Sequence, residues 1–491
     1  MSPATLTESL RGRPAPRFAA LRVVAAKEWL ELRRAPRGRL LVVLTAILML
    51  LAALGGALQF VRSDHERHAA QDADRQLWTQ QGEKDPHSAA HFGQWAFKPP
   101  SLLALADPGI DAYSGSAVWM EAHKRNEMQF RSARDGGVTA RMGGLTLAFV
   151  LQAVLPLLVI VLGFNAVSGE RESGTLRQLL GQGARPAALL AGKALALLRG
   201  VAWLLGPLAL GLAAFGGLMA EPGQAGQAVL RALAWAAAHG LYLAGFVVLT
   251  IAVSALAGSS RAALVSLVAL WLLASFVAPR LMTEVARTAL PLPTAQEFRQ
   301  AVATERSKTF GHDETHPAYA AYRDELLKQY GVRRVEDLPL NFRGLALRKD
   351  DELGYAIYDR LFGELNARIA RQDALRQAPG FLLPLLAAQP LSMALAGTDT
   401  AHHRHFAEAA EAHRRIIQTM TSEDLIRNQR FGDSSYVAGE ALWARVPPFD
   451  YRPPSATWAI ASAWPSWLLL AGWLALTSVL AALAARRLQP I

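Results

Sequence analysis

Six stretches of the sequence are long and apolar enough to cross a lipid bilayer as helices, and this feature constrains the fold most strongly. They cover about residues 40–60, 144–166, 195–215, 232–256, 262–279 and 464–485. A helix of roughly 20 apolar residues spans the hydrocarbon core, which is about 30 Å thick. Backbone polar groups in lipid must be satisfied within the protein, which helices achieve within each segment. The sequence therefore predicts an all-α polytopic membrane protein.

The net charge of +11 has a membrane explanation. Basic loops on the cytoplasmic side and contact with anionic lipid account for such an excess. The sequence carries no nucleic-acid recognition motif, so we expect membrane lipid as a partner and no nucleic acid. The chain has no cysteine, which excludes disulfides, thiolate metal sites and cysteine nucleophiles.

Charges beside the apolar runs predict their orientation. Two arginine clusters flank the membrane part: Arg33, Arg34, Arg37 and Arg39 before the first run, then Arg486 and Arg487 after the last. Because basic residues accumulate on the cytoplasmic side of spans, both termini are expected in the cytoplasm. A cleaved signal peptide is the rival interpretation of the first run. Nearly 40 residues precede it and it is longer than a typical signal core, so we expect an uncleaved span.

These assignments divide the chain into alternating compartments. We predict a cytoplasmic N-terminus (1–38), TM1 (39–61), a first extracytoplasmic insert (62–143), TM2 (144–166), a cytoplasmic loop (167–193), TM3 (194–217), TM4 (230–256), TM5 (262–281), a large second extracytoplasmic insert (282–463) and TM6 (464–485). Residues 1–20, rich in Arg, Pro and Ala, are expected to be loose. The second insert is expected to be mainly helical, because Ala-, Glu-, Arg- and Leu-rich stretches alternate with prolines.

The uncharged run 378–397 has two interpretations. Its length would allow a seventh span. However, three internal prolines would break its helix, and a seventh span would move Arg486 and Arg487 outside, against the charge rule. We interpret it as a buried or membrane-skimming piece of the outer domain.

The loop 167–193 lies between two uncharged runs and reads VSGERESGTLRQLLGQGARPAALLAGK. Its six charged residues make it net positive, which favours the cytoplasmic side. A solvated connector is the plain alternative to a functional loop. The chain lacks the GxxxxGK[ST] pattern of a phosphate-binding loop, since Gly192 and Lys193 are followed by Ala194. We therefore do not expect this chain to hydrolyse ATP alone.

The acidic, Gly- and Thr-containing run GERESGTLRQLLGQGARPAALLAGK after the second of six spans resembles the signature of ABC transporter permeases of the type-2 exporter superfamily. The amphipathic stretch 21–34 (LRVVAAKEWLELRR) resembles the N-terminal elbow helix of that family. The resemblance covers the membrane part, about half of the chain. The large inserts and the run ALAGTDTAHHRHF resemble a bacterial subgroup of unassigned function.

The resemblance implies a fold of six transmembrane helices of ABC type-2 exporter type with a mainly helical extracytoplasmic domain, in the bacterial inner membrane. It implies a nucleotide-binding subunit as partner, which would bind ATP and Mg²⁺, with no cofactor in this chain. It also implies a second permease copy or paralogue, and we add a periplasmic partner. The implied coupling residues are Glu170, Arg171, Glu172, Thr175, Leu176, Arg177, Leu179 and Leu180, and the elbow-helix residues are Lys27, Glu28, Trp29 and Glu31.

Polar residues within the spans are costly and suggest function. Gln152 and His239 are predicted to line a pathway, with hydrogen bonding between helices as the alternative. Arg199 and Arg231 lie near span ends, where we expect their side chains to reach toward the lipid headgroups.

Histidines in the second insert are weak candidates for metal binding. His402, His403 and His405 are close in sequence, and His312 and His316 have a spacing that suits one helix face. Because no further ligand can be identified, we expect no metal and interpret these histidines as solvated or helix-capping.

The sequence thus predicts the permease subunit of an ATP-driven exporter rather than an enzyme. One alternative is a scaffold or mechanotransmission complex in which nothing crosses the membrane. Another is metal delivery to a periplasmic protein, because a related permease assists copper-site assembly in a periplasmic reductase.

Overall fold

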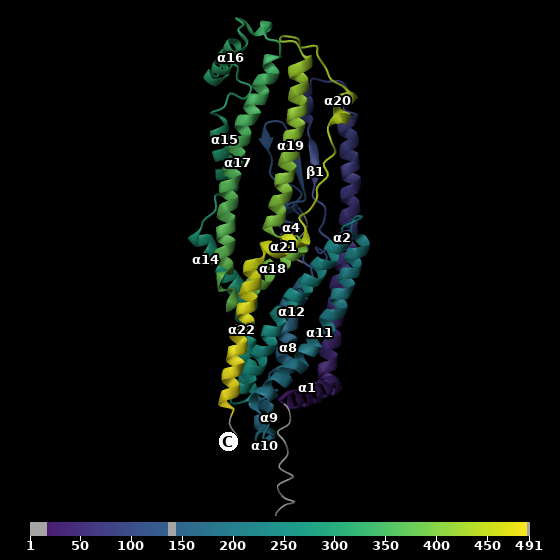
Figure 1. Cartoon of the computed structure of the whole chain (residues 1–491), viewed down its shortest axis with the longest axis vertical. Helices are drawn as coiled ribbons and strands as arrows, with labels where there is room; N and C mark the ends of the chain where they lie inside the picture. The colour runs from purple at the N-terminus through teal and green to yellow at the C-terminus, as the bar shows by residue number, and fades with distance from the viewer. Residues whose placement is uncertain (1–16, 136–143, 489–491) are drawn as a thin grey trace, which may run out of the picture.

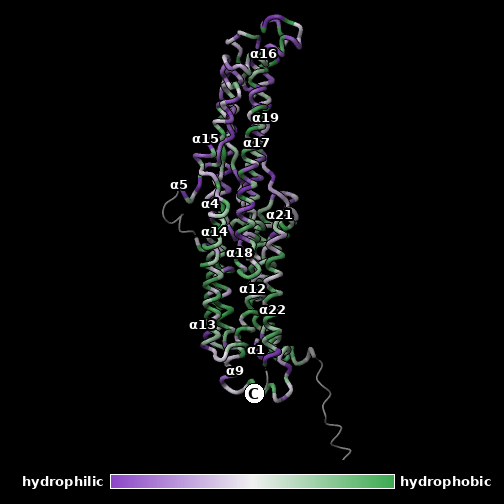
Figure 2. The backbone as a smooth tube through the Cα atoms, turned by 90° about the vertical axis from the view of Figure 1, so that its left-hand side faces the viewer, coloured by the Kyte–Doolittle hydropathy of each residue, from purple (hydrophilic) through white to green (hydrophobic). Residues whose placement is uncertain are grey.

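The computed structural model describes residues 17–135 and 144–488. Of residues 1–20, which were predicted to be loose, 1–16 lie outside the described residues. Residues 17–20 form the first turn of a helix, so the prediction is wrong there. The molecule is a rod with an apolar half and a polar half (Figures 1 and 2). The helix α1 (Arg17–Arg34) and the last turn of α22 lie at the apolar end (Figure 1).

Six helices in the described residues are long and apolar enough to cross a membrane, which confirms the prediction of an all-α polytopic protein at this level. They are α2 (Pro36–Thr79), the composite helix Leu147–Glu172, α11 (Pro186–Met219), α12 (Ala225–Leu256), the composite helix Ser260–Ala289 and α22 (Trp464–Arg487). Each predicted apolar run overlaps one of them. The 44-residue helix α2 continues well beyond its apolar run and enters the polar half (Figure 1).

The two composite helices each contain a π-helical turn. The first consists of α7 (Leu147–Phe149), η2 (Val150–Val154), α8 (Leu155–Gly163) and α9 (Ser168–Glu172), and the second of α13 (Ser260–Leu272), η3 (Leu273–Val277) and α14 (Ala278–Ala289). Pro156 and Pro279 each follow a π turn by two residues. Proline has no N–H to donate to the carbonyl four residues earlier, so the helix is irregular there and frees backbone groups for other partners.

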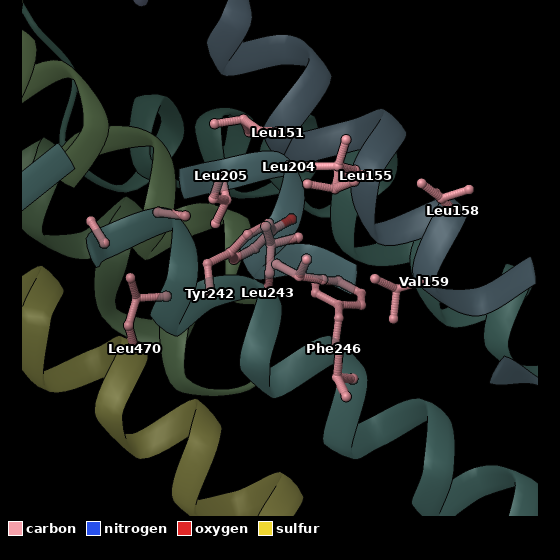
Figure 3. Close-up of a cluster of buried hydrophobic side chains, with 14 of the residues drawn as sticks. Leu151, Leu155, Leu158, Val159, Leu204, Leu205, Tyr242, Leu243, Phe246 and Leu470 are labelled. Atoms are coloured by element: carbon pink, nitrogen blue, oxygen red, sulfur yellow. The ribbon is translucent and has the colours of Figure 1, made fainter. Parts of the chain in front are cut away.

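The apolar core surrounds α8 and α12. The apolar window of the first composite helix is 67% buried and that of α12 is 61% buried, against 17% for α2. Leu151 and Leu155 face Tyr242 and Phe246 of α12 in this core, with Leu470 of α22 on the other side (Figure 3). The remaining spans expose apolar side chains outward, as expected of a surface that meets lipid or another apolar partner.

The polar half, called the head below, combines the end of α2 with most of the two long inserts. Its helices are α3 (Pro86–Phe92), α4 (Asp111–Ser114), α5 (Ser132–Asp135), α15 (Ala295–Arg306), α16 (Pro317–Tyr330), η4 (Val335–Asp337), α17 (Phe342–Gln377), α19 (Thr400–Asn428), α20 (Glu440–Arg445) and α21 (Ala456–Ser462). The long helices α17 and α19 run side by side along it (Figure 1). A small antiparallel sheet, which the sequence did not lead us to predict, joins β1 (Gln94–Phe97), β2 (Ala117–Glu121) and β3 (Lys124–Arg125).

The ambiguous run 378–397 is not among the six span candidates. It forms η5 (Ala378–Phe381) and the buried helix α18 (Leu385–Ala396), which packs on α12 and α22. The Trp235 indole N–H donates to Ser392 Oγ at 2.9 Å, and the Ser392 hydroxyl donates to Asp107 at 2.5 Å. The run is therefore a buried segment between the head and the apolar half, in agreement with the interpretation that we preferred over a seventh span.

Candidate functional site

Two short helices close the apolar end of the rod. The helix α9 follows α8 after a turn, and α10 (Thr175–Gly181) comes after Ser173 and Gly174. Gly174 has a φ of 76°, a conformation that glycine adopts at little cost, and it turns the chain between the two helices. Pro186 then begins α11 at a position where its missing N–H costs nothing. This helix pair occupies the segment that the sequence singled out.

An ion cluster ties this pair to α1 and α11. The buried Lys193 ammonium donates to Glu28 Oε1 and to Glu170 Oε1, each at 2.7 Å. On the solvent side, Lys27 lies 3.0 Å from both Glu28 and Glu31 and 3.8 Å from Glu170. A buried ammonium is stable only when it is paired in this way. The cluster therefore holds three segments together that are far apart in the chain.

Two further charged residues fasten α9 to the next pair of spans. The Arg171 guanidinium donates to the carbonyls of Ala255, at 2.6 Å, and Ala257, where α12 ends. These carbonyls belong to a helix C-terminus, which favours a cation. The Glu172 carboxylate accepts from the backbone N–H and the hydroxyl of Ser260, each at 2.7 Å, where α13 begins. A negative charge is favoured at that end of a helix.

The predicted coupling residues thus divide into three groups by their exposure. Glu172, Thr175 and Arg177 are exposed, whereas Leu176 is buried. The other four are partly buried: Glu170, Arg171, Leu179 and Leu180. From the sequence alone, Glu170, Arg171 and Glu172 looked available to a partner protein. In the structure they bind other residues of this chain. The surface left open on α10 is centred on Arg177 and the neighbouring Gln178, which the sequence analysis did not select.

The predicted elbow helix α1 packs closely on α11. A Cβ atom at Gly192 would lie 2.7 Å from Val24 Cβ, so only glycine allows this approach. Trp29 is half-buried toward Gly200, while Val23 and Leu30 remain exposed. An exposed apolar stripe beside a paired charged stripe is the pattern of a helix that lies in a membrane interface.

The two predicted pathway residues are bonded to each other inside the apolar core. The Gln152 amide lies 3.3 Å from His239 Nε2, and His239 Nδ1 lies 2.9 Å from the Trp235 carbonyl. Pro156 cannot donate to the Gln152 carbonyl, and the Tyr242 hydroxyl donates to it instead at 2.7 Å. In this structure these residues join helices, which is the alternative stated for them.

The histidines selected in the second insert are not brought to one point. His402 Nδ1 bonds Asp399 at 2.6 Å, and its Nε2 faces the Arg231 guanidinium at 3.3 Å. His405 Nδ1 lies 3.0 Å from the Tyr451 hydroxyl. Burial alone would raise the pKa of Asp399, but hydrogen bonds and charge from His402 hold it below its usual range. These contacts indicate a structural role for His402 and His405.

We expected the Arg231 side chain to reach toward the lipid headgroups, but it binds the protein itself. Its guanidinium donates to the carbonyls of Pro454, at 2.6 Å, Ser455, at 3.3 Å, and Leu395, at 3.4 Å. Since these carbonyls belong to the segment before α21 and to α18, Arg231 joins α12 to the base of the head. Arg199 is exposed on α11.

A cavity of about 1170 Å³ lies where the head meets the apolar half. Its walls come from the small sheet and the chain after it, from α15, α17, α18 and α19, and from the first two turns of α22. They include Phe298, Phe362, His403, Trp464 and Leu469. Most of the side chains that line the cavity are apolar. Among them, His403 is the one that the sequence analysis selected, as a weak candidate for metal binding.

Comparison with known proteins gives one finding. A family model described as a domain of unknown function, DUF3526, matches residues 295–452, which run from α15 in the head to beyond α20 and include α18. No curated protein and no solved structure matches the chain. The membrane part and the α9–α10 pair lie outside the matched residues.

Proposed function

We propose that the chain is the membrane-spanning permease subunit of an ATP-driven exporter of the ABC type-2 class. The observation that carries this proposal is the way α9 and α10 are fastened. Arg171, Glu172 and the Glu170–Lys193 ion pair bind α9 to α1, α11, α12 and α13, and Leu176 of α10 is buried in the apolar core. A short helix pair held by four others moves with them as a rigid body. Force applied to α10 would therefore tilt the bundle instead of bending a loop.

The partner that supplies this force is a separate nucleotide-binding subunit. It binds ATP and Mg²⁺ and contacts the open face of α10 at Arg177 and Gln178. This places α10 and both termini in the cytoplasm, the head outside the inner membrane, and α1 in the membrane interface, in agreement with the arginine clusters. A six-span chain lines half of a pathway, so a second copy or a paralogue completes it.

Charge reversal at Arg177 tests the partner contact. The chain is co-expressed with its nucleotide-binding subunit and purified in detergent, and the ATPase that co-purifies is quantified. Arg177→Glu should weaken binding of the nucleotide-binding subunit at least about tenfold. Reversing a charge at the contact places like charges together, which costs more than about 1.4 kcal/mol of binding free energy. Membrane insertion should be normal, because the side chain is exposed.

The matched control is Arg427→Glu, an exposed arginine in the head. It should leave association unchanged. Equal yields of ATPase with both variants and the wild type would reject the contact on α10.

Mechanotransmission without transport is the second candidate, and the continuous helix α2 favours it. Its 44 residues run from the end beside α1 into the head, where the Trp78 indole donates to the Trp443 carbonyl at 2.9 Å. Movement of the bundle would therefore reach the head directly. Reconstitution in vesicles separates the two candidates. ATP-dependent accumulation of a substrate supports export, whereas ATP-dependent distance changes in the head without accumulation support mechanotransmission.

A further inference from the structure

Four histidines that neither the membrane part nor the proposed function uses meet in the head. His87, His91, His123 and His312 each offer a ring nitrogen, and these four atoms lie within 4.8 Å of one another. His91 Nε2 is 3.2 Å and His123 Nε2 is 3.5 Å from His87 Nε2. His123 is largely covered, while His91 and His312 are open to solvent.

The four side chains come from three separate segments. His87 and His91 are four residues apart on α3 and so share one helix face. His123 lies in the turn between β2 and β3, and His312 lies in the loop after α15. The first insert thus supplies three rings and the second insert supplies one.

Neighbouring residues hold two of these segments in place. His123 has a φ of 60°, which is uncommon for a residue with a side chain, and its carbonyl accepts from the Tyr358 hydroxyl at 2.7 Å. Asp350 accepts from the Gly311 N–H at 2.9 Å, directly before His312. A strained residue kept in position by its surroundings is typical of functional sites.

The neighbouring carboxylate of Asp351 sets the tautomer of His123. Asp351 Oδ1 lies 2.9 Å from His123 Nδ1, so this nitrogen carries the proton and donates it. The lone pair of His123 is then on Nε2, which faces His87 Nε2. His91 Nε2 faces the same atom. Since His87 Nε2 can donate at most one hydrogen, it cannot satisfy both neighbours, whereas a cation among the rings would satisfy all of them.

The donor set and spacing fit a transition metal. Tetrahedral zinc with imidazole ligands at roughly 2.0–2.1 Å requires nitrogens about 3.3–3.4 Å apart. The two measured separations, 3.2 and 3.5 Å, are close to this edge. The exposed rings of His91 and His312 can rotate to close the remaining gap. Neutral imidazoles suit zinc and its late first-row neighbours, and do not suit Mg²⁺ or Ca²⁺.

We propose that His87, His91, His123 and His312 bind one late first-row divalent transition ion, such as zinc. Asp351 is the positioning residue, which orients His123 in the manner of carboxylate–histidine–metal triads. The ion would clamp the first insert to the second, because its ligands come from both.

The test uses the full chain purified in detergent and stripped with EDTA. Zn²⁺ is then titrated by calorimetry, the retained zinc is measured by elemental analysis, and melting is followed with and without zinc. The wild type should bind one zinc per chain and melt at a higher temperature with it, since a ligand that binds only the native state stabilises that state. Mg²⁺ should do neither.

Three variants and a control make the test specific. His91→Ala and His312→Ala change solvent-open rings, so the stripped variants should melt like the stripped wild type but lose the bound zinc and its melting shift. Asp351→Asn should weaken zinc binding by about 10- to 100-fold. The control, His65→Ala, removes an exposed histidine of α2 and should bind like the wild type. Zinc binding that is unaffected by His91→Ala and His312→Ala, or matched by Mg²⁺, would overturn the proposal.

Discussion

At the scale of single residues, Lys193 is the side chain on which the apolar end depends most. Its side chain is 2% exposed, and its two carboxylate partners are 14–15% exposed. The burial and pairing of this lysine cannot be predicted from the neighbouring sequence. There it is only the second residue of a Gly-Lys pair that lacks the rest of a phosphate-binding motif. Its partners are 165 and 23 residues away.

We predict that Lys193→Met destabilises the protein by up to about 3–5 kcal/mol, because two largely buried carboxylates then face each other and keep only the half-exposed Lys27 as a nearby cation. Lys27→Met should cost less than about 1 kcal/mol, since Lys27 is half-exposed. Denaturant melts of the purified chain in detergent measure both.

A neutral version of the cluster provides the control. Lys193→Met combined with Glu28→Gln and Glu170→Gln should recover most of the lost stability, because no unpaired charge remains. Equal losses for Lys193→Met and Lys27→Met would show that the buried cluster does not stabilise this end.

At the scale of elements, the contact between α1 and α11 is set by one glycine. Val24 packs where a side chain at Gly192 would lie, and this places Glu28 one turn further along α1 against Lys193. The same helix contains Gly211, where a Cβ atom would meet no atom of a residue beyond its own stretch of helix within 4 Å. The two glycines therefore form a matched pair in one helix.

We predict opposite effects for the same substitution at these two sites. Gly192→Ala should destabilise the protein by about 1–3 kcal/mol, because the added methyl group overpacks the contact and pushes α1 away. Gly211→Ala should be neutral or stabilise by up to about 1 kcal/mol, because alanine is the better helix former. Thermal melts in detergent report the sign, and a cross-link between cysteines placed on α1 and α11 reports the separation. Identical signs at the two sites would contradict this account.

At the scale of the whole molecule, one arginine joins the two halves. Arg231 on α12 donates to carbonyls of α18 and of the segment before α21, so this guanidinium is one of the contacts that attach the head to a central span. The proposed mechanisms require this attachment, since a bundle that tilts without moving the head could do no work outside the membrane.

We predict that Arg231→Met loosens the base of the head. Partly buried carbonyls left without their donor cost about 1 kcal/mol in local stability. Hydrogen exchange should rise in residues 446–462 and remain unchanged in α9 and α10. Arg199→Met, which changes an exposed arginine on α11, should leave exchange in 446–462 as in the wild type. Unchanged exchange in Arg231→Met would mean that other contacts hold the head.

The sequence by itself determined the six long apolar helices and the broken character of 378–397. Transfer of a helix into lipid depends on the summed hydropathy of about 20 consecutive residues, and a proline breaks its own helix wherever it lies. These are local properties, so reading the chain in order recovers them. The prediction that Gln152 and His239 deserve notice was also local, because each is a polar residue in an apolar run.

Only the tertiary structure decided which charges and rings meet. Glu170 and Arg171 look open to a partner in the sequence, yet they bind Lys193 and the end of α12. His312 joins His87, His91 and His123 from more than 180 residues away, and the neighbouring His316 instead caps α16. Side-chain pairing acts over a few ångströms, so it is fixed only when folding brings distant segments together, and no pattern along the chain encodes that distance.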